Sequence, residues 1–264
     1  MVMVKEWRHA VTVCLVFAMG AVAMQPIDAT DVAEAKHKLT VASDTPPSQA
    51  DVKEVADAVL DINAGKIQRA IDGPLTDVVN RYEKQYGNSS DVVFSARGPV
   101  QGLLYLATTA SNHAFKGSGN AIDIGPAWSM AYWARGYGYS EMNRYPEAEA
   151  ELKKALALSP RDAQYASELA YVYQMQKRFS ESLALFEGVP AMLDTMDGWT
   201  DAAKTEYRCK ALRGQGYDLV ELKRYDEAQA AYSACVALIP GEPKSLAELE
   251  YIKSVRAKGG ANGS

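Results

Sequence analysis

Residues 129–160 read SMAYWARGYGYSEMNRYPEAEAELKKALALSP, and residues 163–194 read AQYASELAYVYQMQKRFSESLALFEGVPAMLD. When the second segment is written below the first with an offset of 34 residues, residues of the same kind coincide. The coinciding pairs are Gly136 with Ala170, Tyr139 with Tyr173, Tyr145 with Phe179, Ala148 with Ser182, and Leu152 with Phe186. Small residues let two helices approach closely, and large ones fill the space between helices. A repeat of this length predicts a stack of helix pairs.

A third copy of the pattern follows after an insertion of 12 residues. It lies 80 residues beyond the first copy and contains Gly216, Tyr225, Ala228, Tyr232 and Pro240. These residues correspond to Gly136, Tyr145, Ala148, Leu152 and Pro160. No run between Pro126 and Val255 has the pattern of a strand. The sequence therefore predicts three helix pairs, the third with a lengthened first helix.

In period and residue type, residues 129–240 resemble the tetratricopeptide repeat family. The resemblance implies an all-α fold, an antiparallel helix-pair solenoid with an N-terminal helical extension and a C-terminal capping helix. Residues 244–258 look like that capping helix, because Leu246, Leu249, Ile252 and Val255 share one helical face. The third unit departs from the family at Gln215 and Leu219, and a loop is expected from Val189 to Trp199.

The first 23 residues have the features of a secretory signal peptide. Lys5 and Arg8 precede an apolar stretch, and Ala21-Val22-Ala23 is a small-residue cleavage site. An uncleaved anchor is the alternative. We therefore expect an exported bacterial protein, periplasmic or secreted, that has no membrane segment after cleavage.

The mature chain divides into four parts. Residues 24–48 carry scattered charges and prolines, which favours a flexible linker. Residues 49–125 form a helical extension, possibly a degenerate repeat, with helices over 48–64 and 66–86, a possible kink at Pro74, an apolar connector at Val92–Phe94 and a helix starting near Pro99. Residues 126–258 are the repeat domain, and the glycine-rich residues 259–264 are a flexible tail.

Composition excludes several function classes. The net charge of -5 leaves no basic excess for nucleic acid. After signal cleavage only His37 and His113 remain as histidines, and they lack metal-ligand spacing, so no metal site and no cofactor are expected. No nucleophile motif is present, and no catalytic residues are predicted. The alternative is an enzyme built on residues 51–125, which the family resemblance does not explain.

In the family, the first helices of successive units line a concave groove that binds proteins. The groove positions carried over to this chain are Met130, Trp133, Tyr137 and Glu141 in the first unit, Gln164, Ser167, Tyr171 and Gln174 in the second, and Lys210, Arg213, Tyr217 and Glu221 in the third. Tyr137, Tyr171 and Tyr217 occupy equivalent positions, and tyrosine is enriched in binding hot spots. The alternative is that these aromatic residues only pack between repeats. Because Lys210 and Arg213 have no matching asparagine in the other units, specificity for a C-terminal carboxylate is not predicted.

The resemblance also implies a cysteine pairing. Within a unit the start of the first helix lies beside the end of the second, and Cys209 and Cys235 occupy those two places. A disulfide there would stabilise the fold by roughly 3 to 4 kcal/mol. The alternative is a pair of buried thiols.

Three functions are consistent with the sequence. The first is an adaptor or scaffold in the cell envelope that binds a partner helix or short peptide in the groove. The second is a dedicated inhibitor or immunity-type protein for one exported enzyme. The third is an envelope hydrolase that uses the N-terminal helical region.

Overall fold

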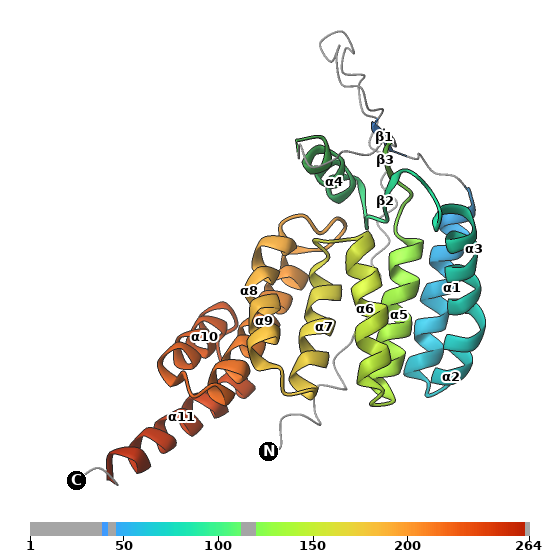
Figure 1. Ribbon diagram of the computed structural model, residues 1–264. Coiled ribbons are helices and arrows are strands. Elements are labelled where there is room, and N and C mark those ends of the chain that lie inside the picture. Colours follow the sequence, from blue (N-terminus) through green and yellow to red (C-terminus); the bar gives the residue numbers. More distant parts are fainter. Residues whose placement is uncertain (1–38, 42–45, 112–119, 262–264) are drawn as a thin grey trace.

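The structure is a computed structural model that describes residues 39–41, 46–111 and 120–261. The predicted signal peptide, His37 and His113 lie outside the described residues. The described part is a row of helices with one small sheet (Figure 1). Three helix pairs form the repeat domain: α5 (Ala127–Glu141) with α6 (Tyr145–Leu158), α7 (Ala163–Met175) with α8 (Phe179–Leu193), and α9 (Asp201–Glu221) with α10 (Tyr225–Leu238). The all-α repeat fold is therefore confirmed, and the first helix of the third unit is the longest described helix.

The turn inside each pair is the same. Asn143, Lys177 and Lys223 have φ angles of 60°, 61° and 62°, in the left-handed region. The N–H of the following arginine donates to a carbonyl near the end of the first helix, at 2.9 Å in the first pair and 2.8 Å in the other two. Two lysines adopt this conformation although it costs about 1 kcal/mol for a residue with a Cβ atom. The three units therefore repeat not only in residue type but also in the backbone geometry of the turn.

Close helix contacts explain the small residues that recur in the repeat. A Cβ atom on Gly136 would lie 2.7 Å from Leu152 Cγ, and one on Gly216 would lie 2.6 Å from Tyr232 Cζ. Both large side chains are fully buried. The packing predicted from the small and large residues is confirmed.

The N-terminal extension packs on α5. It contains α1 (Pro46–Asn63), α2 (Ile67–Ala70), a π-helical turn (Ile71–Leu75) and α3 (Thr76–Tyr86), all in contact with α5 or with one another. The helix over 66–86 is interrupted at Gly73, next to Pro74, where the backbone leaves the helical region. The kink suggested by proline is confirmed.

A three-stranded parallel sheet corrects two expectations. Strand β3 (Ala121–Asp123) lies between β1 (Leu39–Val41) and β2 (Val92–Phe94). Val92–Phe94 is thus a strand and not a connector, and part of the linker range 24–48 pairs with β3. Strands of three residues carry too little alternation to be recognised, and their hydrogen-bond partners are distant in sequence.

Helix α4 (Pro99–Ser111) lies across the ends of the repeat helices (Figure 1). The Tyr105 hydroxyl is 3.1 Å from Ser159 Oγ and accepts a hydrogen bond from the Arg161 N–H at 3.0 Å. Just before α4, the Arg97 guanidinium pairs with the buried Asp162 carboxylate at 2.9 Å. The extension is therefore connected to the repeats by polar contacts as well as by the core.

Two boundaries differ from expectation. Val189–Leu193 belong to α8, with Pro190 inside the helix, so the interrupting loop is shorter than 189–199. Helix α11 (Pro243–Ala261) includes part of the range expected as a flexible tail. Of the helices within 46–111 and 120–261, none is long and apolar enough to cross a membrane.

Candidate protein-binding face

The repeat places the predicted groove residues on the first helices of the units, α5, α7 and α9. We call these positions, with the equivalent positions of α11, the first-helix face. Their exposure to solvent differs strongly from one unit to the next, and this difference decides which of them a partner could contact.

On α5 the chain itself covers the first-helix face. Met130, Trp133 and Tyr137 are all buried. The Trp133 ring stacks on Tyr137 and on Tyr165, with ring centroids 6.0 and 6.1 Å apart. The Tyr137 hydroxyl donates to Asn63 Oδ1 at 3.0 Å, at the end of α1. These residues were predicted to line the groove, but in the structure they make internal packing contacts. This agrees with the alternative interpretation, in which the aromatic residues only pack between repeats.

The electrostatic surroundings of Tyr137 are consistent with its burial. Burial raises the pKa of Tyr137, and the carboxylates of Glu141 and Glu168 raise it further. The phenol therefore stays neutral and serves as a hydrogen-bond donor to Asn63.

On α7 the polar groove residues are engaged inside the chain. Gln164 Oε1 accepts from the Arg97 guanidinium at 3.0 Å, and the Ser167 hydroxyl donates to the Ala163 carbonyl at 2.7 Å. Gln174 Nε2 donates to Asp218 Oδ1 at 3.0 Å.

Tyr171, the aromatic groove residue of the second unit, is buried as well, with 9% of its surface exposed. The second unit therefore offers a partner little surface at the predicted positions.

On α9 the side chains are partly exposed. Lys210 Nζ lies 3.3 Å from Glu168 Oε1 of the preceding unit, and Arg213 Nη1 lies 3.3 Å from Glu242 Oε1. Tyr217 meets Phe179 edge-on, with ring centroids 6.1 Å apart. Burial, followed by the charge of Glu221 and other carboxylates, raises the pKa of Tyr217. Apart from Glu141 at the end of α5, which is partly exposed, the predicted residues first become open to solvent in the third unit.

Tyr251 on α11 continues the row, and the sequence interpretation misses it. It follows Tyr217 by 34 residues and so has the same repeat position as Tyr137, Tyr171 and Tyr217. It is 49% exposed. Extending the repeat period into the capping helix would have found it. The tyrosine row therefore has four members, and it opens towards the C-terminal end.

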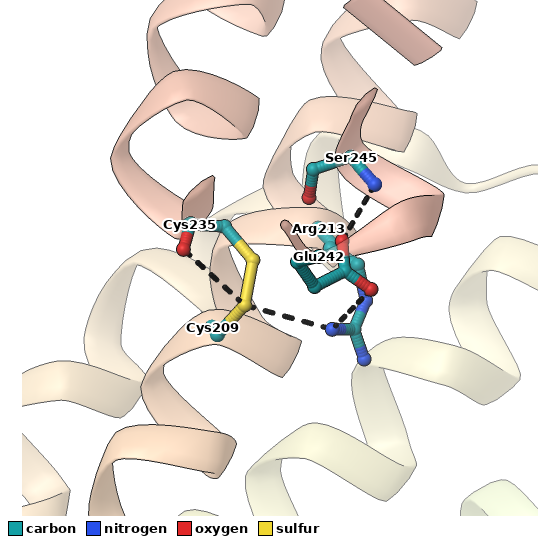
Figure 2. The surroundings of a disulfide bond; sticks show 5 residues. All are labelled: Cys209, Arg213, Cys235, Glu242 and Ser245. Carbon is teal, nitrogen blue, oxygen red and sulfur yellow. Dashed lines mark hydrogen bonds and ion pairs between the residues drawn. A yellow bond between two sulfur atoms is a disulfide. The ribbon is translucent and has the colours of Figure 1, made fainter. Parts of the chain in front are cut away.

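A disulfide cross-links the two helices of the third unit, next to α11 (Figure 2). The structure joins Cys209 to Cys235, whose Cα atoms are 4.6 Å apart, and so connects α9 to α10. Arg213 Nη1 lies 3.6 Å from Cys209 Sγ and also contacts Glu242, whose carboxylate accepts the Ser245 N–H at 2.6 Å, at the start of α11.

The sulfurs and the Glu242 carboxylate lie within 4.8 Å of one another. A disulfide lacks the thiolate charge that metal binding needs. The cluster therefore connects three helices while the bond is formed.

Two buried polar groups lie beneath the first-helix face at α9. Burial raises the pKa of Asp218 to about 7, against the lowering effect of the hydrogen bond that Gln174 donates to its carboxylate. The Tyr232 hydroxyl has no hydrogen-bond partner among the described residues, although the side chain is fully buried. An unsatisfied donor of this kind costs about 1 to 3 kcal/mol.

Comparisons with known proteins give matches only among solved structures. No protein-family model matches the sequence, and no curated protein matches it. The first TPR domain of Spaghetti (RPAP3), bound to an HSP90 peptide, is 19% identical with a TM-score of 0.43, covering 49% of this chain and 93% of that chain. MamA AMB-1 is 15% identical with a TM-score of 0.48, covering 79% and 84%. The N-terminal domain of stress-induced protein-1 from C. elegans is 16% identical with a TM-score of 0.42, covering 47% and 94%.

The class of protein rests on the chain's own features. The 34-residue period, the repeated left-handed turn and the small-to-large contacts between paired helices define a tetratricopeptide-type repeat protein. Its open first-helix surface lies at α9 and α11.

Proposed function

We propose that this protein is a protein-binding adaptor of the bacterial cell envelope, and that its partner segment binds the first-helix face at α9 and α11. One observation carries the proposal: the tyrosine row is buried at α5 and α7, half-buried at α9 and 49% exposed at α11. Tyrosine offers a large, rigid contact surface with a polar end, and an exposed tyrosine on an ordered helix loses little entropy on binding.

Two features support the proposed location. The first residues have the pattern of a signal peptide, and a disulfide is typical of proteins that fold in an oxidising compartment.

The two buried carboxylates of the N-terminal extension, those of Asp51 and Asp123, favour binding over catalysis. Asp51 forms an ion pair with Arg81 at 2.6 Å. Asp123 accepts backbone N–H groups of Ala96 and Gly125 at 2.9 and 3.2 Å. These contacts give both carboxylates a structural role, whereas a hydrolase would need a pair of them directed at a substrate.

Cross-linking in envelope extracts tests the proposal. The double variant Tyr217→Ala/Tyr251→Ala removes the open part of the row, and Tyr225→Ala on α10 is the matched control. We expect partners that cross-link to the wild type and to the control to disappear from the double variant, while circular dichroism shows that all three are folded. If the double variant retains every partner, the first-helix face is not the binding surface.

The same experiment separates the adaptor from an inhibitor. Several cross-linked proteins are expected for an adaptor, and one stoichiometric enzyme for a dedicated inhibitor or immunity-type protein.

A further inference from the structure

Two glutamates occupy equivalent places in the repeat but have different surroundings. Glu168 on α7 and Glu248 on α11 are 80 residues apart, the same offset that relates the first unit to the third. Glu168 is buried, and its carboxylate pairs with Lys210 Nζ at 3.3 Å. Lys210 belongs to the next first helix, α9. In this array a lysine from the following unit thus neutralises a glutamate of the preceding one.

Helix α11 is the last described helix, and within the described residues Glu248 has neither an ion pair nor a hydrogen bond to its carboxylate. Lys244, one turn earlier on α11, does not form an ion pair with it. The side chain is half-buried, and burial raises the pKa of its carboxyl group. Among the described residues no cation pairs with this partly buried carboxylate, which is unfavourable, and a cationic group that binds there would relieve it.

The same end of the molecule exposes apolar side chains. Leu246 and Tyr251 on α11 are 43% and 49% exposed, and Leu238 on α10 is 37% exposed. In the second unit, the residue equivalent to Leu246 is Ala166, which is fully buried. Among the described residues, no further helix covers at α11 the surface that successive units bury against one another.

The unsatisfied hydroxyl of Tyr232 lies close to the same place. The Tyr232 ring passes over Gly216, and the charge of Glu248 is the largest contribution after burial to the raised pKa of the phenol. Because Tyr232 is fully buried, Glu248 is the polar group that this apolar surface offers to a partner.

We propose that the C-terminal end binds a partner segment carrying a lysine or arginine, whose cationic group pairs with Glu248 as Lys210 pairs with Glu168. Apolar residues beside that cation pack on Leu246 and Tyr251. Glu221, exposed at the end of α9, adds to the negative charge near Tyr217, and an acidic segment would be repelled. This inference rests on the proposed function and specifies the chemistry of the partner.

Synthetic peptides test the inference. The probe is a fluorescein-labelled 12-residue peptide with leucines at helical spacing and one central lysine; the matched peptides carry arginine, glutamine or glutamate there. Binding to the full chain is measured by fluorescence anisotropy. We expect the lysine and arginine peptides to bind at least about 10-fold more tightly than the glutamine peptide, since hydrogen bonds to charged groups contribute about 1.5 to 3 kcal/mol.

The variant Glu248→Gln is expected to lower the affinity of the lysine peptide to that of the glutamine peptide. The control is Glu250→Gln, two residues further along α11, where the glutamate is exposed and paired with Lys253. This variant is expected to keep the preference. Equal binding of lysine and glutamine peptides to the wild type, or a preference that persists in Glu248→Gln, would overturn the inference.

The outcomes also separate this inference from the proposed function. If peptides bind without a charge preference and binding still requires Tyr217 and Tyr251, the inference fails and the proposed function stands. If no peptide binds and the cross-linked partners are unchanged in the double tyrosine variant, both fail.

Discussion

Reduction of the disulfide between Cys209 and Cys235 should lower the stability of the protein measurably. The bond spans 26 residues, and closing a loop of that length removes chain entropy worth about 3.5 kcal/mol from the unfolded state. For a urea dependence of about 2 to 3 kcal/mol per molar, the unfolding midpoint should fall by about 1 to 2 M. The assay is urea unfolding followed by circular dichroism, with and without a phosphine reductant.

The control is the double variant Cys209→Ala/Cys235→Ala, whose midpoint must not respond to the reductant. Because both cysteines are fully buried, samples are reduced in urea before refolding. If oxidised and reduced wild-type protein unfold at the same urea concentration, the bond does not constrain the unfolded chain and the reasoning is refuted.

Three further predictions concern buried groups. Burial raises the pKa of Asp218 from 3.8 to about 7, so the folded state binds the proton more strongly and stability should fall as pH rises from about 4 to 7, by at most about 4 kcal/mol. Asp218→Asn should flatten this part of the stability profile, and an unchanged slope in chemical unfolding would contradict it. Gly216→Ala should cost about 1 to 3 kcal/mol because the new methyl group meets the Tyr232 ring, as read from the thermal midpoint; no loss would mean that the ring can shift freely. Arg97→Ala should cost about 3 to 5 kcal/mol because it leaves the Asp162 carboxylate buried without its cation; a loss below about 1 kcal/mol in urea unfolding would exclude that role.

The repeat domain could be predicted from sequence because its contacts are local and repeated. Gly136 and Leu152, for example, meet within one helix pair, so the spacing of small and large residues reports the contact directly. The kink at Pro74 was visible for the same reason, since proline acts on the backbone of its own turn.

Contacts between distant segments could not be predicted. Strand β2 pairs with β3 across the range that contains α4, and three residues of apolar sequence do not specify that pairing. The burial of Trp133 and Tyr137 depends on α1, whose position beside α5 is not encoded in the repeat pattern. Family geometry alone therefore predicts which positions lie on the first helices but not how exposed they are.

The contacts of the segment before and within α4 have a consequence for folding cooperativity. Repeat arrays commonly behave as one-dimensional chains in which each unit is stabilised only by its neighbours. Here Arg97 reaches Asp162, and the Gln101 N–H reaches the Asp197 carboxylate at 3.2 Å, so the segment links the first two units and the loop beyond them. These units should open together, in one cooperative hydrogen-exchange event, whereas α11 should exchange independently and earlier. The helix that exchanges first would then be the one that carries the open tyrosine, Tyr251.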